Sequence, residues 1–250
     1  MVQYPFRAFP SSASSRSRGT RSSSTTGPWG MRCVGSTLLL AALLLLLPAT
    51  PVVAQDGELR IVPSAGVMVP TSILYRSDLP QSTAELGNAP VVSLGVHAMS
   101  RNFPLSVRVT LDRLDWFDTT VEGRFGGQVH PFTVPTAITL VTGDLLVHPF
   151  RWEGVAPYAF GGFGMKNYSF GSESPSDDGF GFNFPEDGTS GRIHYGVGAE
   201  FGLAGQTVGA EAGGNYNRFV LVDDSREATR SEDQHEFVLR VLLPLPLVTF

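Results

Sequence analysis

The chain has 250 residues with 18 basic and 23 acidic side chains, so its formal net charge is −5. This acidic balance argues against a nucleic-acid partner, because phosphates require a basic binding surface. The single cysteine, Cys33, precedes the expected mature chain. That position excludes disulfides, thiolate metal sites and a cysteine nucleophile from the mature protein.

The N-terminal region has the layout of a secretory signal peptide over residues 31–54. Arg32 precedes an apolar run from Leu38 to Leu47, and a stretch of small residues ends at Ala54, just before Gln55. The run is too short for a membrane-spanning helix, which needs about 20 residues. We predict export and cleavage between Ala54 and Gln55. Residues 1–30 are expected to be a disordered extension, or the product of a start codon placed upstream of the true one.

The mature chain, residues 55–250, is expected to form one domain. The five arginines of residues 1–54 leave it with 13 basic and 23 acidic residues, a net charge of −10. Eight segments have strand patterns, and no stretch has a convincing helical period. In chain order they are Leu59–Pro70, Val91–Ser100, Leu105–Asp112, Ala137–His148, Val155–Tyr168, Gly191–Leu203, Thr207–Arg218 and His235–Leu243.

Each predicted strand has one apolar face and one polar or glycine-rich face. The alternation is clearest in Gly191–Leu203, where Ile193 and Val197 fall on one face while Arg192 and Glu200 fall on the other. Small and charged residues crowd together on the polar face. That crowding indicates a confined interior rather than open water.

The connections between the predicted strands alternate in length. Strand lengths are sufficient for a tilted membrane span of about 9–11 residues. Alternating connections place all the long loops at one end of an up-and-down sheet, as in transmembrane barrels. In lipid, such a sheet satisfies its backbone hydrogen bonds by closing. The sequence therefore predicts an all-β fold, an eight-stranded antiparallel up-and-down transmembrane β-barrel. The long connections are 71–90, 113–136, 169–190 and 219–234.

The polar faces predict a lumen filled by charged side chains. The interior of an eight-stranded barrel is just wide enough for its own side chains. Buried charges are tolerated mainly when they are paired. We therefore predict a salt-bridge network that plugs the barrel, with a gated ion path through the same residues as the alternative. Its members are Arg60, Arg108, Asp112, Asp144, Arg192, Glu200, Glu211 and Arg240.

The expected signal peptide, the eight strands, the segment Pro157–Gly164 and the terminal Phe250 together resemble the small outer-membrane β-barrel family. Its best-known members are the transmembrane domain of outer membrane protein A and outer membrane protein X. The resemblance implies contact with outer-membrane lipids and lipopolysaccharide. It also implies insertion by the outer-membrane assembly machinery, for which Phe250 is the expected signal. Pro244 and Pro246 depart from the family pattern because proline cannot donate in a strand ladder. Either the last strand ends near Leu243 or the signal is unusual.

Two other functions stay open from the sequence. A barrel enzyme that modifies lipids, of the lipid A deacylase or acyltransferase type, needs a hydroxyl beside an imidazole. The best constellation is Ser93 with His97 and, across the next strand, Ser106 or Thr110, but no nucleophile-elbow motif surrounds it. The other function is a soluble secreted lipocalin-like binding barrel, which requires its apolar face inward.

The remaining polar and aromatic residues indicate structural roles. The loop acids Asp177, Asp178, Glu186 and Asp187 lack the spacing of a calcium site. We expect no enzyme activity, cofactor or metal, and a structural or surface-interaction role through four exposed loops. The sequence sets no oligomeric state. Aromatic residues expected to form girdles at the membrane interfaces are Trp116, Phe117, Phe150, Trp152, Tyr168 and Phe219.

Overall fold

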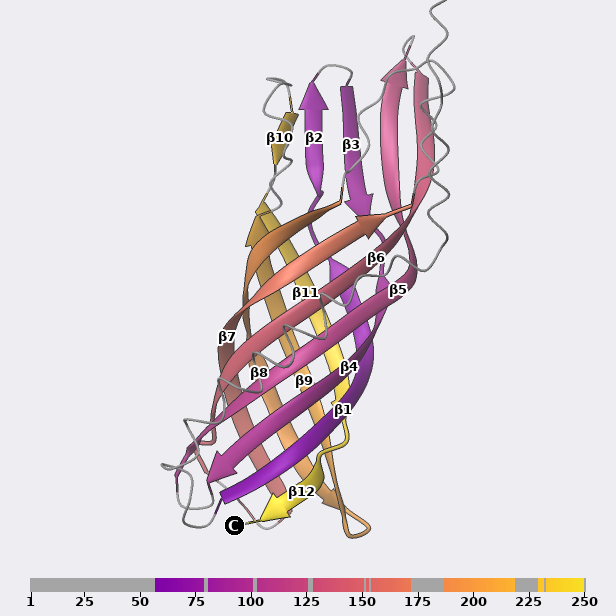
Figure 1. The fold of residues 1–250 in the computed structure, drawn as a ribbon. Coiled ribbons are helices and arrows are strands. Elements are labelled where there is room, and N and C mark those ends of the chain that lie inside the picture. Colours follow the sequence, from indigo (N-terminus) through magenta and orange to yellow (C-terminus); the bar gives the residue numbers. More distant parts are fainter. Residues whose placement is uncertain are drawn as a thin grey trace, which may run out of the picture.

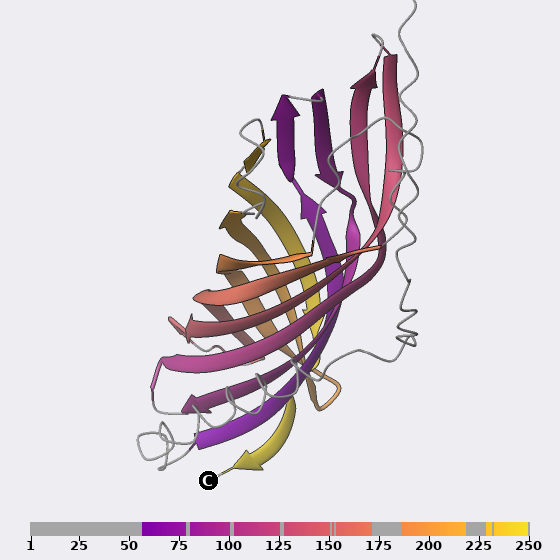
Figure 2. The ribbon, with the colours of Figure 1, turned by 45° about the horizontal axis from the view of Figure 1, so that its top comes forward.

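The computed structural model describes residues 57–78, 81–100, 103–125, 128–150, 152, 154–171, 187–218, 229–231 and 233–249. Within these ranges, no helix is long and apolar enough to cross a membrane. Eight antiparallel strands wind round a closed ring, steeply tilted (Figures 1 and 2). They are β1 (Gly57–Pro70), β4 (Ala89–Ser100), β5 (Leu105–Phe125), β6 (Gln128–Val147), β7 (Val155–Phe170), β8 (Gly188–Leu203), β9 (Gln206–Arg218) and β11 (Asp233–Leu242).

The ring closes because β1 has a partner on both edges. It pairs with β4 from Gly57 to Met68 and with β11 from Ser64 to Pro70. The other ring strands pair in chain order, β4 with β5, β5 with β6 and so on to β9 with β11. The predicted fold class, an eight-stranded antiparallel up-and-down barrel, is confirmed, and each of the eight predicted segments forms one of its strands.

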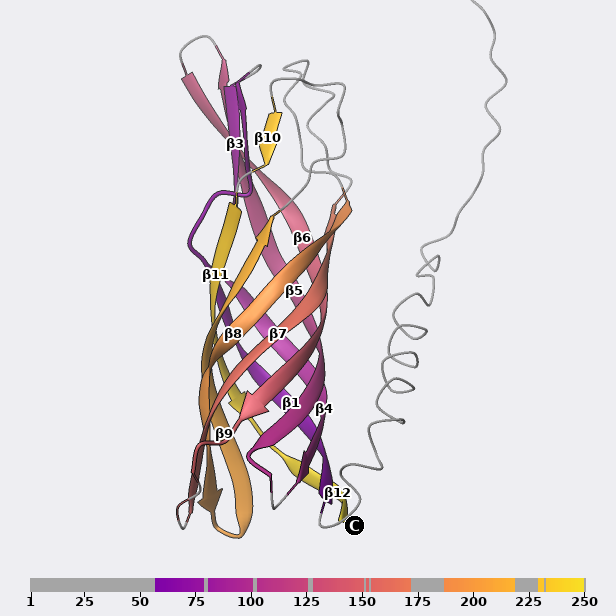
Figure 3. The ribbon, with the colours of Figure 1, turned by 90° about the vertical axis from the view of Figure 1, so that its left-hand side faces the viewer.

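The interiors of two predicted loops are strands. Residues 113–125 continue β5, residues 128–136 begin β6, and residues 71–90 contain β2 (Tyr75–Asp78) and β3 (Gln81–Leu86). Together with β10 (Thr229–Ser231), these segments form a sheet in the order β10-β2-β3-β5-β6, which stands above the ring in Figures 1 and 3. We call this sheet the crown. The expectation of four long loops is therefore wrong for two of them, while most of the other two lies outside the described residues.

A β-bulge explains why the sequence pattern hid the longer β5. The register with β6 shifts between Leu114 and Phe117, and Trp116 has a positive φ of 61°. A bulge inserts one extra residue, so the alternation resumes out of phase. Beyond it, Phe117, Thr119 and Val121 continue the buried face that Leu114 ends.

The polarity of the barrel is inverted relative to a soluble protein. Ile193, Val197 and Phe201 on the outer wall are 42%, 60% and 42% exposed, whereas Arg108 and Arg192 inside are 3% exposed. A soluble lipocalin-like barrel requires the opposite arrangement, so that interpretation is wrong. The apolar outer wall is the surface expected of strands surrounded by acyl chains.

Glycines on the inner face make room for two lumen rings. A Cβ at Gly198 would lie 2.5 Å from the Tyr158 ring, and one at Gly196 would lie 2.5 Å from the tip of Phe160. A Cβ at Gly213 would lie 2.9 Å from Phe160. The inner face is therefore glycine-rich on β8 and β9 because large rings from β7 fill the space.

The chain ends in a short strand below a break. β11 stops at Leu242, and β12 (Leu245–Thr249) pairs with the lower part of β1, placing Pro246 opposite Arg60. Pro244 lies in the link between them, so the last strand ends close to the point that the prolines predict. Ala54, Gln55 and Phe250 lie outside the described residues, and the cleavage site and assembly signal stay predictions.

The expected aromatic girdle forms only in part. Trp116 is 86% exposed near the upper end of the ring, and Phe150 packs on Trp152 near the lower end with ring centroids 4.3 Å apart. Phe117 and Tyr168, however, are 7% and 0% exposed. Their assignment to the girdle is wrong, because both point inward. Phe219 lies outside the described residues.

Candidate functional site

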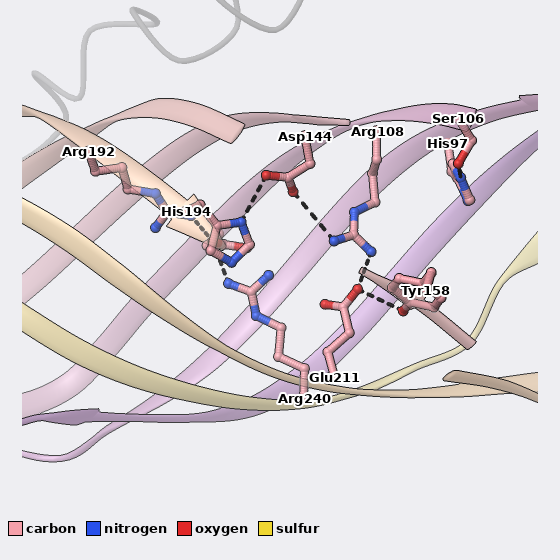
Figure 4. Close-up of polar contacts among 10 residues, drawn as sticks. His97, Ser106, Arg108, Asp144, Tyr158, Arg192, His194, Glu211 and Arg240 are labelled. Atoms are coloured by element: carbon pink, nitrogen blue, oxygen red, sulfur yellow. Dashed lines mark hydrogen bonds and ion pairs between the residues drawn. The ribbon is translucent and has the colours of Figure 1, made fainter. Parts of the chain in front are cut away.

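The centre of the lumen is built round Arg108 of β5. Its Nη1 donates to Glu211 Oε1 at 2.5 Å, and its Nη2 donates to Asp144 Oδ2 at 3.4 Å. Tyr158 Oη donates to the same Glu211 oxygen at 2.8 Å. These side chains come from β5, β6, β7 and β9, so the contacts in Figure 4 connect four strands across the lumen.

A second group surrounds Asp112, on the same inner face of β5. Arg240 Nη2 donates to Asp112 Oδ2 at 2.7 Å, and Arg192 Nη2 lies 3.6 Å from that oxygen. His194 Nδ1 lies 2.9 Å from Asp144 Oδ1 of the first group (Figure 4). The side chains of Asp112, Arg192 and Arg240 are each at most 4% exposed. A buried carboxylate between two guanidinium groups compensates charges that would be costly alone.

The remaining two predicted charges lie apart, at the lower mouth of the barrel. Arg60 Nη1 donates to Glu200 Oε2 at 2.7 Å, and Arg60 Nε donates to Glu58 Oε1 at 2.9 Å. These side chains are 11–14% exposed, more than those at the centre. The structure thus places six of the eight predicted residues in two central groups of three, one round Arg108 and one round Asp112, and the other two in a separate pair to which it adds Glu58.

A further polar layer above the centre was missed from the sequence. Lys166 of β7 forms a buried ion pair with Glu236 of β11, and Asn215 Nδ2 donates to Glu236 Oε2 at 3.1 Å. Glu236 lies on the polar face of its predicted strand, and this position is enough to predict that it points into the lumen. Lys166 was not assigned, because the glycine-rich segment before it tolerates either phase of alternation.

The same layer continues through neutral side chains. Asn217 Nδ2 donates to the Tyr168 hydroxyl and to Gln234 Oε1, both at 2.8 Å. Tyr168 Oη in turn donates to Gln234 Oε1 at 2.6 Å. This triangle lies between the Lys166 ion pair and the apolar residues above it.

The upper lumen is filled by an apolar cluster shared with the crown. Leu140 and Ile138 on β6 are 1% and 0% exposed and pack with Leu86 and Val121 of the crown. The cluster comprises Met68, Leu74, Ala84, Leu86, Ala89, Val91, Leu114, Phe117, Val121, Val134, Ile138, Leu140, Tyr168 and Val238. Leu140 breaks the polar pattern of its strand because it belongs to this cluster.

A hydroxyl between two imidazoles lies in the lower lumen. His97 Nε2 is 2.8 Å from Ser106 Oγ, and His148 Nε2 is 3.0 Å from the same oxygen. Of the predicted constellation, the structure brings His97 and Ser106 together, with His148 rather than Ser93 or Thr110 as the third member. All three are at most 4% exposed and face the lumen.

The described residues contain no group of three or more His, Cys, Asp or Glu side chains placed to hold a metal ion. The loop acids Asp177, Asp178 and Glu186 lie outside those residues. Asp187 is described, and its Oδ1 accepts a hydrogen bond from the Phe170 amide at 2.7 Å. Asp187 therefore anchors the chain at the upper end of β7.

The fold and the lumen together define the class of protein. A closed antiparallel ring with an apolar outer wall and a packed, charged interior is a membrane-spanning β-barrel, because closure leaves no unpaired strand edge in the lipid.

No family model and no curated protein matches the chain. Among solved structures it is similar to the outer membrane protein OprG from Pseudomonas aeruginosa (12% identity, 76% of this chain and 94% of that one, TM-score 0.44). It is also similar to Neisserial surface protein A (15%, 74% and 95%, TM-score 0.38) and to the N-terminal β-barrel domain of OprF from Pseudomonas aeruginosa (11%, 76% and 100%, TM-score 0.38).

Proposed function

We propose that this protein is a closed outer-membrane barrel of a didermal bacterium, with a structural or surface-interaction role. The observation that carries the proposal is the inverted polarity, with an apolar wall outside and paired charges inside. The signal peptide expected over residues 31–54 supports delivery across the inner membrane. Because the crown continues the barrel on the side of the long connections, it is the part presented to the outside of the cell.

The filling of the lumen supports a closed barrel over the gated ion path. Arg108 and Arg240 each bind carboxylates on other strands, so movement of either one breaks contacts across the barrel. Above them, the aliphatic side chains of the apolar cluster offer no polar partner to a hydrated ion. An ion would have to displace both layers to cross.

The outer face of the crown supports a surface role. Glu85 on β3, and Asp118 and Glu122 on β5, are exposed there, while the inner face of the same strands carries Leu86, Val121 and other cluster members. The crown is thus held to the barrel by its apolar face and turns an acidic face outward. A partner that binds this face would need basic or hydrogen-bonding groups.

Single-cysteine labelling tests the proposal. Because Cys33 lies in the expected leader, the variants Glu122→Cys and Gln206→Cys give mature proteins with one thiol each, in the crown and beside the lower β8–β9 turn. A membrane-impermeant maleimide added to intact cells should label Glu122→Cys alone, and should label Gln206→Cys only after the outer membrane is permeabilised. Labelling of both variants on intact cells, or of Gln206→Cys alone, would contradict the proposed orientation.

One observation favours the second candidate, a lipid-modifying enzyme: the hydrogen bond between Ser106 and His97. Against it, both side chains are buried and face the lumen, whereas lipid contacts the outer wall. We therefore propose a structural role for this trio. Mass spectrometry of lipid A from expressing cells should show the same acylation with the wild type and with His97→Ala. A change that the wild type produces and His97→Ala abolishes would instead support the enzyme.

A further inference from the structure

The outer wall has an apolar groove, and we propose that it binds one acyl chain of a membrane lipid. The groove has a volume of about 330 Å³ and lies over β8, β9 and β11. Its floor is formed by Gly196, Ala212, Gly213 and Gly214, with Tyr195 and Phe237 at the two sides. The inference rests on the proposed membrane location, since only then does this wall contact lipid.

Two of the floor residues, Gly196 and Gly213, belong to the inner face of the barrel and present only backbone to the groove. The tip of Phe160 lies so close to Gly196 and Gly213 that a Cβ at these positions would be 2.5 Å and 2.9 Å from it. Neither position can therefore carry an inward side chain without moving this ring. On the outer side, Ala212 and Gly214 add no more than a methyl group to the same stretch of wall.

Two rings form the sides of the groove. Tyr195 on β8 and Phe237 on β11 are 50% and 44% exposed, and β9 runs between their strands. Tyr195 leans across the floor, because a Cβ at Gly214 would lie 3.0 Å from its ring. The floor is thus recessed between two rigid aromatic side chains, which make a trough for a single chain rather than a flat patch.

The chemistry of the lining selects an acyl chain. Among the described residues that line the groove, only Glu236 has a carboxylate, and this group turns into the lumen and binds Lys166 there. The wall beyond the groove is also apolar, with Leu239 and Val241 exposed along β11. Below His235 the groove therefore offers dispersion contacts and no charge, and it is continuous with the apolar wall that the proposed location places against acyl chains.

The upper end of the groove marks where the lipid headgroup would lie. Thr71 Oγ1 donates to the His235 carbonyl at 2.8 Å, and the His235 amide donates to Ser72 Oγ at 2.9 Å. The His235 ring packs on Tyr216 with centroids 5.1 Å apart. Amphipathic rings of this kind favour the boundary between hydrocarbon and headgroups. The chain would enter from this end and run down between Tyr195 and Phe237.

Native mass spectrometry of the full mature protein released from dimyristoylphosphatidylcholine nanodiscs tests the inference. The wild type should retain one lipid under activation that removes the rest. Ala212→Leu, which fills the floor, should lower the singly bound fraction about fivefold, since the preference comes from dispersion contacts alone. Ala98→Leu is the matched control on the outer wall of β4 and should behave like the wild type.

A second pair of variants removes a side of the groove without filling it. Phe237→Ala should also lower lipid retention, whereas Phe163→Ala, which removes a ring that is 75% exposed on β7, should not. Equal retention in Ala212→Leu and the wild type would overturn the inference. So would a wild-type dimer that Ala212→Leu abolishes, because the groove would then bind a second copy. Failure of the wild type itself to insert into nanodiscs would instead count against the proposed membrane location.

Discussion

The lower and upper halves of the lumen are filled in opposite ways. In the lower half, charged groups such as Arg108, Asp144 and Glu211 meet across the barrel. In the upper half, inward residues such as Ile138 and Leu140 join the crown in one apolar cluster. The contrast teaches that a strand pattern can show which residues point inward without fixing the polarity of the space they fill.

The two halves are also stabilised by different interactions. A buried ion pair contributes little net free energy when complete, but removal of one partner leaves an uncompensated charge. An apolar cluster loses stability in proportion to the cavity that a truncation opens. Substitutions in the lower half should therefore destabilise the protein by leaving a charge unpaired, and those in the upper half by opening a cavity.

The largest effect is expected from Asp112→Ala. It leaves Arg192 and Arg240 without their shared carboxylate in a fully buried position. The free energy of unfolding should fall by about 3–5 kcal/mol. Urea unfolding in detergent micelles, followed by the heat-modifiable shift on a gel, measures this change.

Asp115→Ala is the matched control for that variant. Asp115 pairs with Arg113 on the outer side of β5, and the two side chains are 30% and 41% exposed. Exposed pairs contribute about 0–1 kcal/mol. Equal losses in the two aspartate variants would contradict the difference between lumen and wall.

Truncation of a side chain in the apolar upper half should cause the next largest loss of stability. Leu140→Ala opens a cavity beneath the crown and should lower the free energy of unfolding by about 2–5 kcal/mol. Leu145→Ala removes the same atoms from a side chain that is 48% exposed on the outer wall, and its cost should be no more than about 1 kcal/mol. The same urea titration checks both variants. A larger loss for Leu145→Ala than for Leu140→Ala would contradict the location of the apolar cluster inside the barrel.

A smaller loss of stability is expected when a glycine on the inner face gains a methyl group. A Cβ at Gly162 would meet the Gly143 carbonyl and lie 2.8 Å from the Asp144 Cα, whereas one at Gly143 meets nothing within 4 Å. Gly162→Ala should therefore cost about 1–3 kcal/mol. Gly143→Ala, one residue before Asp144, the register partner of Gly162, should leave the urea midpoint close to that of the wild type. A similar loss in both would show that the inner face is not tightly packed.

Much of the barrel follows from the two-residue period of its strands. Val107, Val109 and Leu111 alternate with polar residues, and the pairing of β5 with β4 and β6 keeps that phase. The crown was hidden because the bulge at Trp116 shifts the phase by one residue. Pro131 and Pro135 also argue against a strand in general. Within the described residues, however, no strand pairs with the other edge of β6 before Thr136, and an edge strand tolerates proline.

The charged centre was predictable as a set of residues and not as a set of pairs. Arg60 and Arg108 share a polar face in the sequence, but only the three-dimensional register places one at the mouth and the other at the centre. The trio of His97, Ser106 and His148 joins three strands, and no local motif marks such a contact. Partners across a barrel depend on the shear of the closed ring, which the sequence of one strand does not contain.

A nitroxide scan along β8 from Arg192 to Phe201 tests the inverted polarity most directly. Each variant carries one spin label, and collision with oxygen in lipid vesicles is measured at every position. The account predicts a period of two, with oxygen accessibility highest at positions 193, 195, 197, 199 and 201 and lowest at the positions between them. Maxima at positions 192, 194 and 200, or an absence of the two-residue period, would contradict it.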